Sequence, residues 1–264
     1  MPAMGTETAR QAFVREATHA LLHSGFTPPV DGEASVLLFD STPWRFRRAD
    51  AYALLDTRER ERALRFHYPH DRDTYVLAHA FWRVVLGIVL DTDAANVSLT
   101  STAAGQPCLP HVPHATSLSH SGSHVAIAVG IARTLGIDIE QSPPHIALHG
   151  IAQILCSPAE AAALEAMPAA AREHALLSLW TRKEALLKAF GIGLRESPSA
   201  IRADIGVGVD PPASVDDAPT CLVHQLDLPE TLVGALAAPL SVTRLSLHWI
   251  DPSHAGDDMG RAIA

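Results

Sequence analysis

Two acidic residues stand two positions apart in segment 136–140, where Asp138 and Glu140 alternate with Ile137 and Ile139. Side chains at positions i and i+2 of a β-strand point to the same face, so both carboxylates project together while the isoleucines point to the opposite layer. Two carboxylates this close repel each other unless a cation lies between them. One or two carboxylates, with waters and phosphate oxygens, are typical ligands of Mg²⁺. The pattern therefore fits a magnesium site, and an edge strand with two solvated acids is the alternative.

A second candidate group lies in segment 180–189, where helical spacing places Trp180, Glu184 and Lys188 on one stripe. Glu184 followed by Lys188 is also an ordinary helix-stabilising pair on a solvated face. The functional alternative makes Glu184 a third metal ligand and gives Lys183 and Lys188 the task of binding phosphates. These lysines stand out because arginine supplies most of the basic residues in this chain.

Two further segments could bind an anion. We expect residues 120–123, between two strands, to form a turn that carries His120, and a histidine there can contact a phosphate or act as a base. The serines and glycine beside it could form a small anion nest, and an ordinary turn histidine is the alternative. The other segment is an arginine-rich helix, for which a solvated Arg/Glu surface is the alternative. Its basic residues are Arg58, Arg60, Arg62 and Arg65, and Arg72 and Arg83 follow them as further members of the basic run.

The elements that must position these residues follow from hydrophobic periodicity and capping signals. The pattern predicts helices over 7–26, 58–66, 71–89 and 171–189, and strands over 36–39, 116–119, 125–129, 135–140, 232–237 and 242–249. Ser157, Pro158 and Glu160 have the spacing of an N-cap, a first helical position and a capping-box glutamate, so a helix should begin there. Helical material followed by a short run of strands occurs in both halves, which permits two similar lobes.

Composition excludes several classes of protein. The chain has 264 residues, of which 47% are hydrophobic, and this length suffices for a core without disulfides or a structural metal. A net charge of −9 disfavours nucleic acid and anionic membranes as partners. The three cysteines lie far apart and form no C-x-x-C pair. Because we also find no signal peptide and no apolar run long enough to span a bilayer, we expect a cytoplasmic protein without membrane or nucleic-acid partners.

Five motifs, in this order, resemble those of the Sfp-type 4′-phosphopantetheinyl transferases, and the similarity covers residues 54–200. They are Gly105-Gln106-Pro107, Leu118-Ser119-His120-Ser121, Gly136-Ile137-Asp138-Ile139-Glu140, Ser157-Pro158-Ala159-Glu160, and the run from Trp180 through Lys183-Glu184-Ala185, Lys188-Ala189, Gly191 and Gly193-Leu194. The resemblance implies an α+β fold in which two similar α/β lobes form a pseudo-dimer within one monomeric chain, with the ligand cleft between them. We expect an N-terminal lobe over 1–130 and a C-terminal lobe over 131–264, with a tail of undefined role from about residue 210.

The resemblance also implies a reaction. Coenzyme A would donate its 4′-phosphopantetheine arm to a serine of an apo acyl or peptidyl carrier protein, releasing adenosine 3′,5′-bisphosphate with Mg²⁺ or Mn²⁺ as the metal. The pathway of the carrier, whether fatty-acid, polyketide or nonribosomal-peptide synthesis, stays open. The alternatives are a coenzyme A-binding protein without transfer activity and a Mg²⁺-dependent phosphodiesterase that uses the same carboxylates.

Carried over to this sequence, the family's site residues fall into three groups. The metal ligands would be Asp138, Glu140 and Glu184. The catalytic residues would be Glu184, Lys188 and His120, with Glu160 as the rival base and its capping position as the structural alternative. The residues that contact coenzyme A would be Arg62, Gly105, Gln106, Pro107, Ser119, His120, Lys183 and Lys188.

Three departures from the family's pattern are visible. Position 106 is glutamine, where the family often has a basic residue. Leu155-Cys156 stands where an aromatic residue usually precedes the Ser-x-x-Glu element. Arginine replaces lysine across the basic helix, which keeps the charge but changes its geometry. The three expected metal ligands are unaffected.

Overall fold

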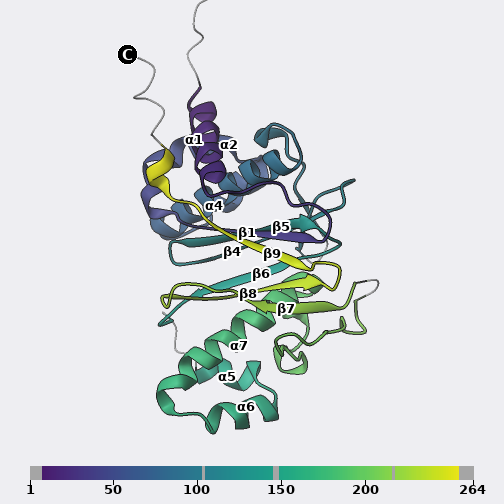
Figure 1. Cartoon of the computed structure of the whole chain (residues 1–264). Coiled ribbons are helices and arrows are strands. Elements are labelled where there is room, and N and C mark those ends of the chain that lie inside the picture. Colours follow the sequence, from purple (N-terminus) through teal and green to yellow (C-terminus); the bar gives the residue numbers. More distant parts are fainter. Residues whose placement is uncertain (1–7, 103–104, 145–148, 216–217, 256–264) are drawn as a thin grey trace, which may run out of the picture.

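The computed structural model describes residues 8–102, 105–144, 149–215 and 218–255. Two β-sheets lie between two groups of helices, so that helix, sheet, sheet and helix follow one another as layers (Figure 1). One apolar cluster fills the space between the first helices and the first sheet, a second lies under the last long helix, and a third fills the space between the sheets. Within the described residues, no helix combines the length and the apolar character needed to cross a bilayer.

The first sheet has the strand order β4-β5-β1-β9. Strand β5 (His124–Ile131) runs antiparallel to both β4 (His114–Ser121) and β1 (Glu33–Asp40), whereas β9 (Arg244–Trp249) runs parallel to β1. The register pairs Val36 of β1 with Ala128 on one side and with Leu247 on the other. Strand β1 is apolar over nearly its whole length because both of its faces are covered.

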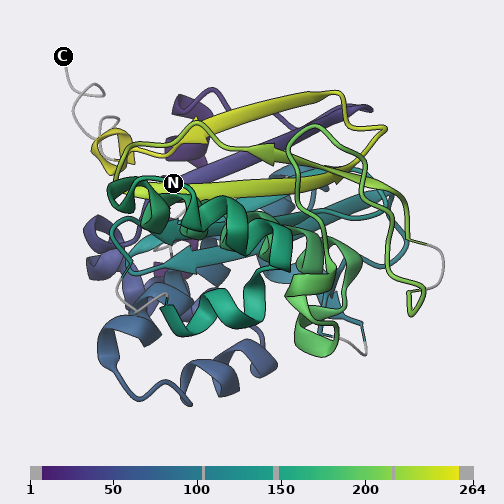
Figure 2. The ribbon, with the colours of Figure 1, turned by 90° about the horizontal axis from the view of Figure 1, so that it is seen from below.

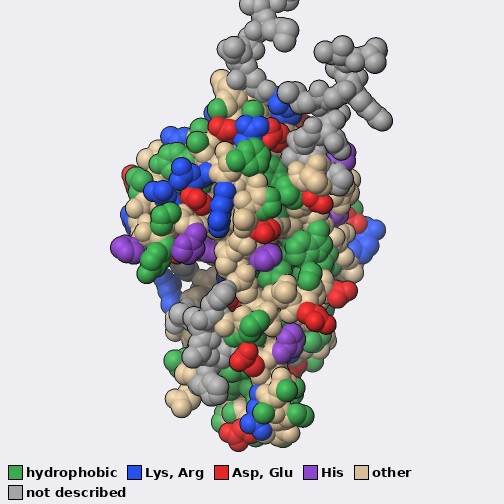
Figure 3. Space-filling view, turned by 90° about the vertical axis from the view of Figure 1, so that its left-hand side faces the viewer, with side chains coloured by type: hydrophobic (Ala, Val, Ile, Leu, Met, Phe, Trp, Pro, Cys, Tyr) green, Lys and Arg blue, Asp and Glu red, His purple; other side chains and the backbone are tan. Residues whose placement is uncertain are grey.

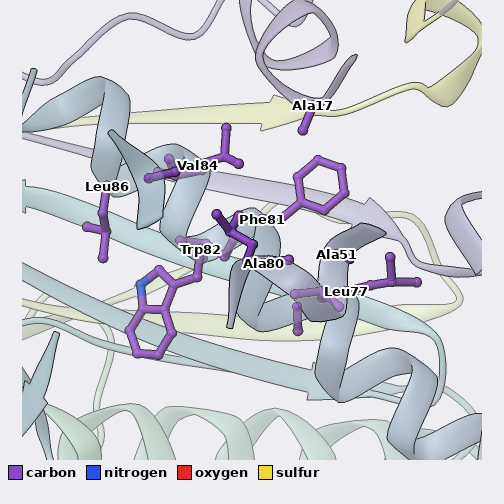
Figure 4. Close-up of a cluster of buried hydrophobic side chains, with 14 of the residues drawn as sticks. Ala17, Ala51, Leu77, Ala80, Phe81, Trp82, Val84 and Leu86 are labelled. Carbon is purple, nitrogen blue, oxygen red and sulfur yellow. The ribbon is translucent and has the colours of Figure 1, made fainter. Parts of the chain in front are cut away.

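Helices cover the outer face of this sheet. They are α1 (Ala9–His23), α2 (Arg48–Leu54), α3 (Thr57–Ala63) and α4 (Pro69–Val89). Phe81 of α4 lies at the centre of their core (Figure 4), with its ring 4.4 Å from that of Phe39 and 4.7 Å from that of Trp44 between centroids. This aromatic cluster fixes α4 over the sheet, and α4 in turn contacts α3.

The second sheet has the order β6-β8-β7, and all of its pairs are antiparallel. Its strands are β6 (Gly136–Gln141), β7 (Cys221–Gln225) and β8 (Leu232–Pro239), and its helices are α5 (His149–Leu155), α6 (Pro158–Glu165) and α7 (Ala169–Phe190). Seen from below, α7 lies across the sheet (Figure 2). Glycine is required at position 136 because an added Cβ would collide with the backbone carbonyl of Ala185 in α7.

The two halves of the chain run through the same order of elements. Strand β1, helices α2 to α4 and strands β4 and β5 correspond in order to β6, α5 to α7, β7 and β8. In each sheet the last strand of the series lies between the other two. Some elements have no counterpart in this pattern, namely helix α1, the short strands β2 (Thr100–Ser101) and β3 (Pro107–Cys108), and strand β9.

Several sequence-based expectations need correction. Residues 244–249 were assigned to the C-terminal lobe, but β9 pairs with β1 in the first sheet, because its partner is a strand more than 200 residues away. His120 belongs to β4 and not to a turn, since the connection to β5 contains only Gly122 and Ser123. Helices α2 and α5 and strand β7 were not predicted. The other expected helices and strands are present with shifted ends.

Candidate active site

A cavity of about 620 Å³ opens between the helix-covered side of the first sheet and the C-terminal end of α7. Its size suits a ligand with the dimensions of a nucleotide cofactor. On the face shown in Figure 3, basic and histidine side chains gather over the upper half of the molecule, above a hollow between the two halves. Among the residues that line the cavity are Arg58 and Arg62 of α3 with Arg65 just after it, Gly105, Gln106 and Pro107 at the start of β3, Ser117 and Leu118 of β4, and Leu187, Lys188 and Gly191.

Asp138 lies next to this cavity, on β6, and is only 5% exposed. Its Oδ1 atom accepts hydrogen bonds from Lys188 Nζ at 2.7 Å and from Ser119 Oγ at 2.9 Å. Lys188 Nζ also donates to the carbonyl of Ile137 at 2.9 Å. The other oxygen, Oδ2, is buried and has no hydrogen-bond partner among the described residues. A buried carboxylate oxygen without a partner is costly, so this atom is suited to a ligand.

Glu140 and Glu184 add negative charge to the same place. Burial, together with the charges of Asp138 and Glu140, raises the pKa of Glu184. Burial and the charge of Asp138 also raise the pKa of Glu140, against the opposing effect of hydrogen bonds from Ser121 and Trp180. Ile137 and Ile139 point into the core between the sheets, as strand alternation predicts, so the acidic residues occupy the opposite face, toward α7.

The acidic cluster fits a hard divalent cation. It offers carboxylate oxygens, one of which is a buried atom without a partner among the described residues, and burial together with neighbouring carboxylates raises the pKa of both Glu140 and Glu184. In the described part of the chain, no three His, Cys, Asp or Glu side chains converge into a preformed cage. Mg²⁺ does not require one, because it commonly keeps several waters and takes one or two protein carboxylates beside phosphate oxygens.

His120 is exposed at the end of β4, close to this cluster. Surrounding protein and the nearby Lys188 ammonium lower the pKa of its imidazole. At neutral pH the ring is therefore neutral, with one nitrogen able to donate a hydrogen bond and the other able to accept one.

The comparisons with known proteins point to one superfamily. Residues 134–231, which include the acidic cluster and all of α7, match the family model of the 4′-phosphopantetheinyl transferase superfamily. Over these residues the chain is similar to this superfamily. It is 29% identical to the 4′-phosphopantetheinyl transferase HetI of Nostoc sp. over 71% of this chain and 80% of HetI. It is 30% identical to the 4′-phosphopantetheinyl transferase Sfp of Bacillus subtilis over 54% of this chain and 62% of Sfp.

The structure brings most of the superfamily residues expected from the sequence to one place. Arg62, Gly105, Gln106, Pro107 and Lys188 line the cavity. Asp138 and Lys188 are in direct contact, and the charges of Glu140 and Glu184 act on each other and on Asp138. One wall of the cavity thus carries arginines, and the acidic cluster lies beside another wall, which carries Lys188.

Lys183 and Glu160 occupy a different place from the one expected. Lys183 is 0% exposed, and its ammonium donates to the carbonyls of Leu155 and Pro198 and to Glu160 Oε2, at 2.8, 3.0 and 2.7 Å. Glu160 in addition accepts the N–H of Ser157, which completes the capping box of α6. This placement differs from the expected phosphate-contacting and catalytic roles, because both side chains point to the packing of α5 and α6 and neither lines the cavity described above.

Two further residues differ in detail. Ser119 was expected on the adenine side of the ligand, but its buried hydroxyl points to Asp138. Gln106 lines the cavity, yet its amide Nε2 donates to Thr134 Oγ1 and to the carbonyls of Lys188 and Ala189, each at 3.0 Å. Gln106 therefore caps the C-terminal turn of α7 from the first half of the chain.

The sequence-based reasoning missed a network under the arginine-bearing wall. Arg83 of α4 is only 2% exposed and donates from Nε to Glu59 Oε2 at 2.6 Å and from Nη2 to Asp56 Oδ2 at 2.7 Å. Asp56 and Glu59 form the capping box of α3, and His79 lies 3.0 Å from the other oxygen of Glu59. The Asp-x-x-Glu spacing was the available signal. This network fixes the helix that carries Arg58 and Arg62 and leads into Arg65.

Proposed function

We propose that this protein transfers the 4′-phosphopantetheine arm of coenzyme A to a serine of an apo acyl or peptidyl carrier protein and releases adenosine 3′,5′-bisphosphate. The observation that carries the proposal is a single cavity that has the arginines of α3 on one side and, on the other, Lys188 in contact with a buried Asp138 whose Oδ2 atom lacks a partner. The arginines suit a polyanionic substrate, and phosphoryl transfer needs a lysine and a carboxylate that can hold a metal ion.

The two walls suggest how coenzyme A would lie. The guanidinium groups of Arg58, Arg62 and Arg65 suit the terminal 3′-phosphate, because arginine binds phosphate oxygens in a bidentate manner. The loop at 105–107 would line the adenine side. The pyrophosphate would then reach Lys188 and His120, where an ammonium and a neutral imidazole can donate to its oxygens.

Asp138, Glu140 and Glu184 would hold Mg²⁺ or Mn²⁺ through carboxylate oxygens, including the free Oδ2 atom of Asp138. When bound, such an ion neutralises charge on the pyrophosphate so that a hydroxyl can approach phosphorus. The residues present fit this ion because they supply only hard oxygen donors at a point of excess negative charge.

Glu184 is the candidate for the general base. Burial and neighbouring carboxylates raise its pKa toward the range in which a carboxylate accepts a proton efficiently. In the proposed reaction the carrier serine hydroxyl loses its proton to Glu184, directly or through water. The serine oxygen then forms a bond to the phosphorus next to the pantetheine arm, while the bond from that phosphorus to the bridging oxygen breaks. Lys188 compensates the charge that develops on the leaving phosphate.

We further infer that the chain is a monomer of two similar lobes with the active site between them. The repeated order of elements and the matching strand orders of the two sheets support this inference. The cavity takes residues from both halves of one chain, so a second subunit is not needed to complete it. Cys108, Cys156 and Cys221 are all free thiols, which favours a reducing compartment such as the cytoplasm.

The decisive experiment mixes the protein with coenzyme A, Mg²⁺ and an apo carrier protein and weighs the carrier by intact-mass spectrometry. We expect the carrier to gain one phosphopantetheine, and we expect Asp138→Ala and Glu184→Gln to abolish the gain. Glu173→Gln, on the exposed face of the same helix as Glu184, is the matched control and should retain activity. Free phosphopantetheine without carrier modification would identify a phosphodiesterase, and coenzyme A binding without either product would identify a binding protein.

A further inference from the structure

The two sheets meet along strands β4 and β6, which belong to different sheets. Alternate residues of β4 are serines, and their hydroxyls take the place of strand carbonyls at this junction. Ser117, Ser119 and Ser121 accept the backbone N–H groups of Ile137, Ile139 and Gln141 at 3.1, 3.3 and 3.0 Å, respectively. The offset of twenty residues is constant, so the two strands run parallel. We call these three residues the serine ladder.

Two members of the serine ladder make a second hydrogen bond. Ser119 Oγ donates to Asp138 Oδ1 at 2.9 Å, and Ser121 Oγ donates to Glu140 Oε2 at 2.6 Å. A hydroxyl has one donor and two acceptor positions, so it can accept the N–H of β6 and donate to a carboxylate at the same time. Both serines are buried, and bulk water therefore cannot replace their hydroxyls.

These bonds select which carboxylate oxygen remains available. Ser119 and Lys188 both bind Oδ1 of Asp138, and Oδ2 is the atom left without a partner. Ser121 holds one oxygen of Glu140 in the same way. Each acidic side chain is thereby fixed by a group on the neighbouring sheet.

We propose that Ser119 and Ser121 are positioning residues, which orient the carboxylates of Asp138 and Glu140 toward a divalent cation while they join the two sheets. This inference rests on the proposed function, because it concerns the metal site of that reaction. Partners that bind the ligands of a metal commonly affect its affinity by 10- to 100-fold. The geometry of the metal site would accordingly depend on how the two sheets are placed.

The serine ladder contains its own control. Ser117 accepts an N–H of β6 like the other two, but no bond from its hydroxyl to a carboxylate is present among the described contacts. We expect Ser119→Ala and Ser121→Ala to weaken Mn²⁺ binding by about tenfold or more. Ser117 also lines the cavity proposed for coenzyme A, so it is a control for Mn²⁺ binding measured without coenzyme A. In that measurement Ser117→Ala should lower the unfolding temperature to a similar extent and leave the Mn²⁺ dissociation constant within about twofold of wild type. Ser121→Thr, which keeps the hydroxyl, should recover most of the affinity.

The measurement is a titration of Mn²⁺ into the full chain without coenzyme A, in which free Mn²⁺ is counted by electron paramagnetic resonance. Thermal unfolding of each variant is recorded in parallel, and Ser121→Ala carries the test if Ser119→Ala does not fold. Equal affinities of wild type, Ser119→Ala and Ser121→Ala would overturn the positioning role, and so would an equal loss in Ser117→Ala. If neither wild type nor Asp138→Ala binds Mn²⁺, the result contradicts the metal site itself and, with it, the proposed metal-dependent function.

Discussion

Each half of the chain contains a buried cationic side chain that forms an ion pair with the glutamate of a helix capping box. Arg83 of α4 binds Glu59, and Lys183 of α7 binds Glu160. Each glutamate is the third residue of a capped short helix, and each closes a capping box with its own N-cap residue. In both halves a long helix therefore holds the start of a short helix through one ion pair.

The difference lies in what the short helix does next. Helix α3, which Arg83 holds, carries Arg58 and Arg62 into the cavity, and Asp56 and Glu59 themselves line it. Helix α6, held by Lys183, lies away from that cavity. The same ion-pair arrangement therefore supports a wall of the cavity in the first half and only the fold in the second. We expect its loss to lower both stability and ligand affinity in the first half, but stability alone in the second.

The largest effect is expected for Arg83→Met. This change leaves Glu59 buried without its cation, which typically costs about 3–5 kcal/mol of unfolding free energy. It also frees α3, so the KM for coenzyme A should rise by about tenfold or more while kcat changes less. Urea unfolding and steady-state kinetics at neutral pH measure the two quantities. A destabilised variant with an unchanged KM would show that α3 does not depend on Arg83 for its position.

Lys183→Met should lower the free energy of unfolding without changing the KM for coenzyme A. We expect a loss of about 3 kcal/mol, at the lower end of the range for buried pairs, because the Glu160 side chain is 22% exposed and partly hydrated. The KM for coenzyme A should remain near that of wild type, since Lys183 does not reach the cavity. The same urea and kinetic measurements apply. A large rise in KM with little loss of stability would restore the phosphate-contacting role expected from the sequence.

A smaller effect is expected at Gln106, which connects the two halves. Gln106→Glu removes the amide donor from the carbonyls of Lys188 and Ala189 and should cost about 1–3 kcal/mol. Gln106→Lys restores a donor, so it should cost less. Thermal unfolding of the two variants provides the test. An equal drop in unfolding temperature would mean that the packing of the Gln106 side chain, and not its hydrogen-bond donor, stabilises the end of α7.

The smallest effect concerns pH. Burial alone would raise the pKa of Glu59, but the hydrogen bonds from His79 and Arg83 outweigh it and lower the pKa below 4.5. A carboxylate whose pKa is lower in the folded state stabilises the protein fully above its unfolded pKa, and this contribution is lost as the pH falls. Wild type should therefore lose stability more steeply than Glu59→Gln between pH 5 and pH 3. Urea midpoints across this range provide the test, and parallel curves would contradict it.

Local patterns predicted part of this structure correctly. The alternation of Asp138 and Glu140 with isoleucines fixes which face each side chain takes, because the period of a strand is two. The capping box at Ser157 and Glu160 depends on residues three positions apart, and it is present as expected. Both signals are short enough to be complete within the sequence segment that carries them.

Signals that depend on distant partners could not be predicted in this way. Lys183 and Glu184 are neighbours that point in directions about 100° apart around the helix, and packing against α5 and α6 decides which of them is buried. Arg83 was expected to belong to a basic run that binds an anion, but it is buried against Glu59, a partner 24 residues away that the spacing does not reveal. The pairing of β9 with β1 leaves no trace in the periodicity of either strand.

The place of β9 also bears on how the chain folds during its synthesis. Strand β1 leaves the ribosome among the first 40 residues, but its parallel neighbour β9 follows only at residues 244–249. Every residue of the second sheet and of its helices is made in the interval, so the C-terminal half is a continuous insertion that can fold before the N-terminal sheet is complete. Until then β1 has an open edge that could pair with another chain, and a protein truncated near residue 240 would keep that edge permanently.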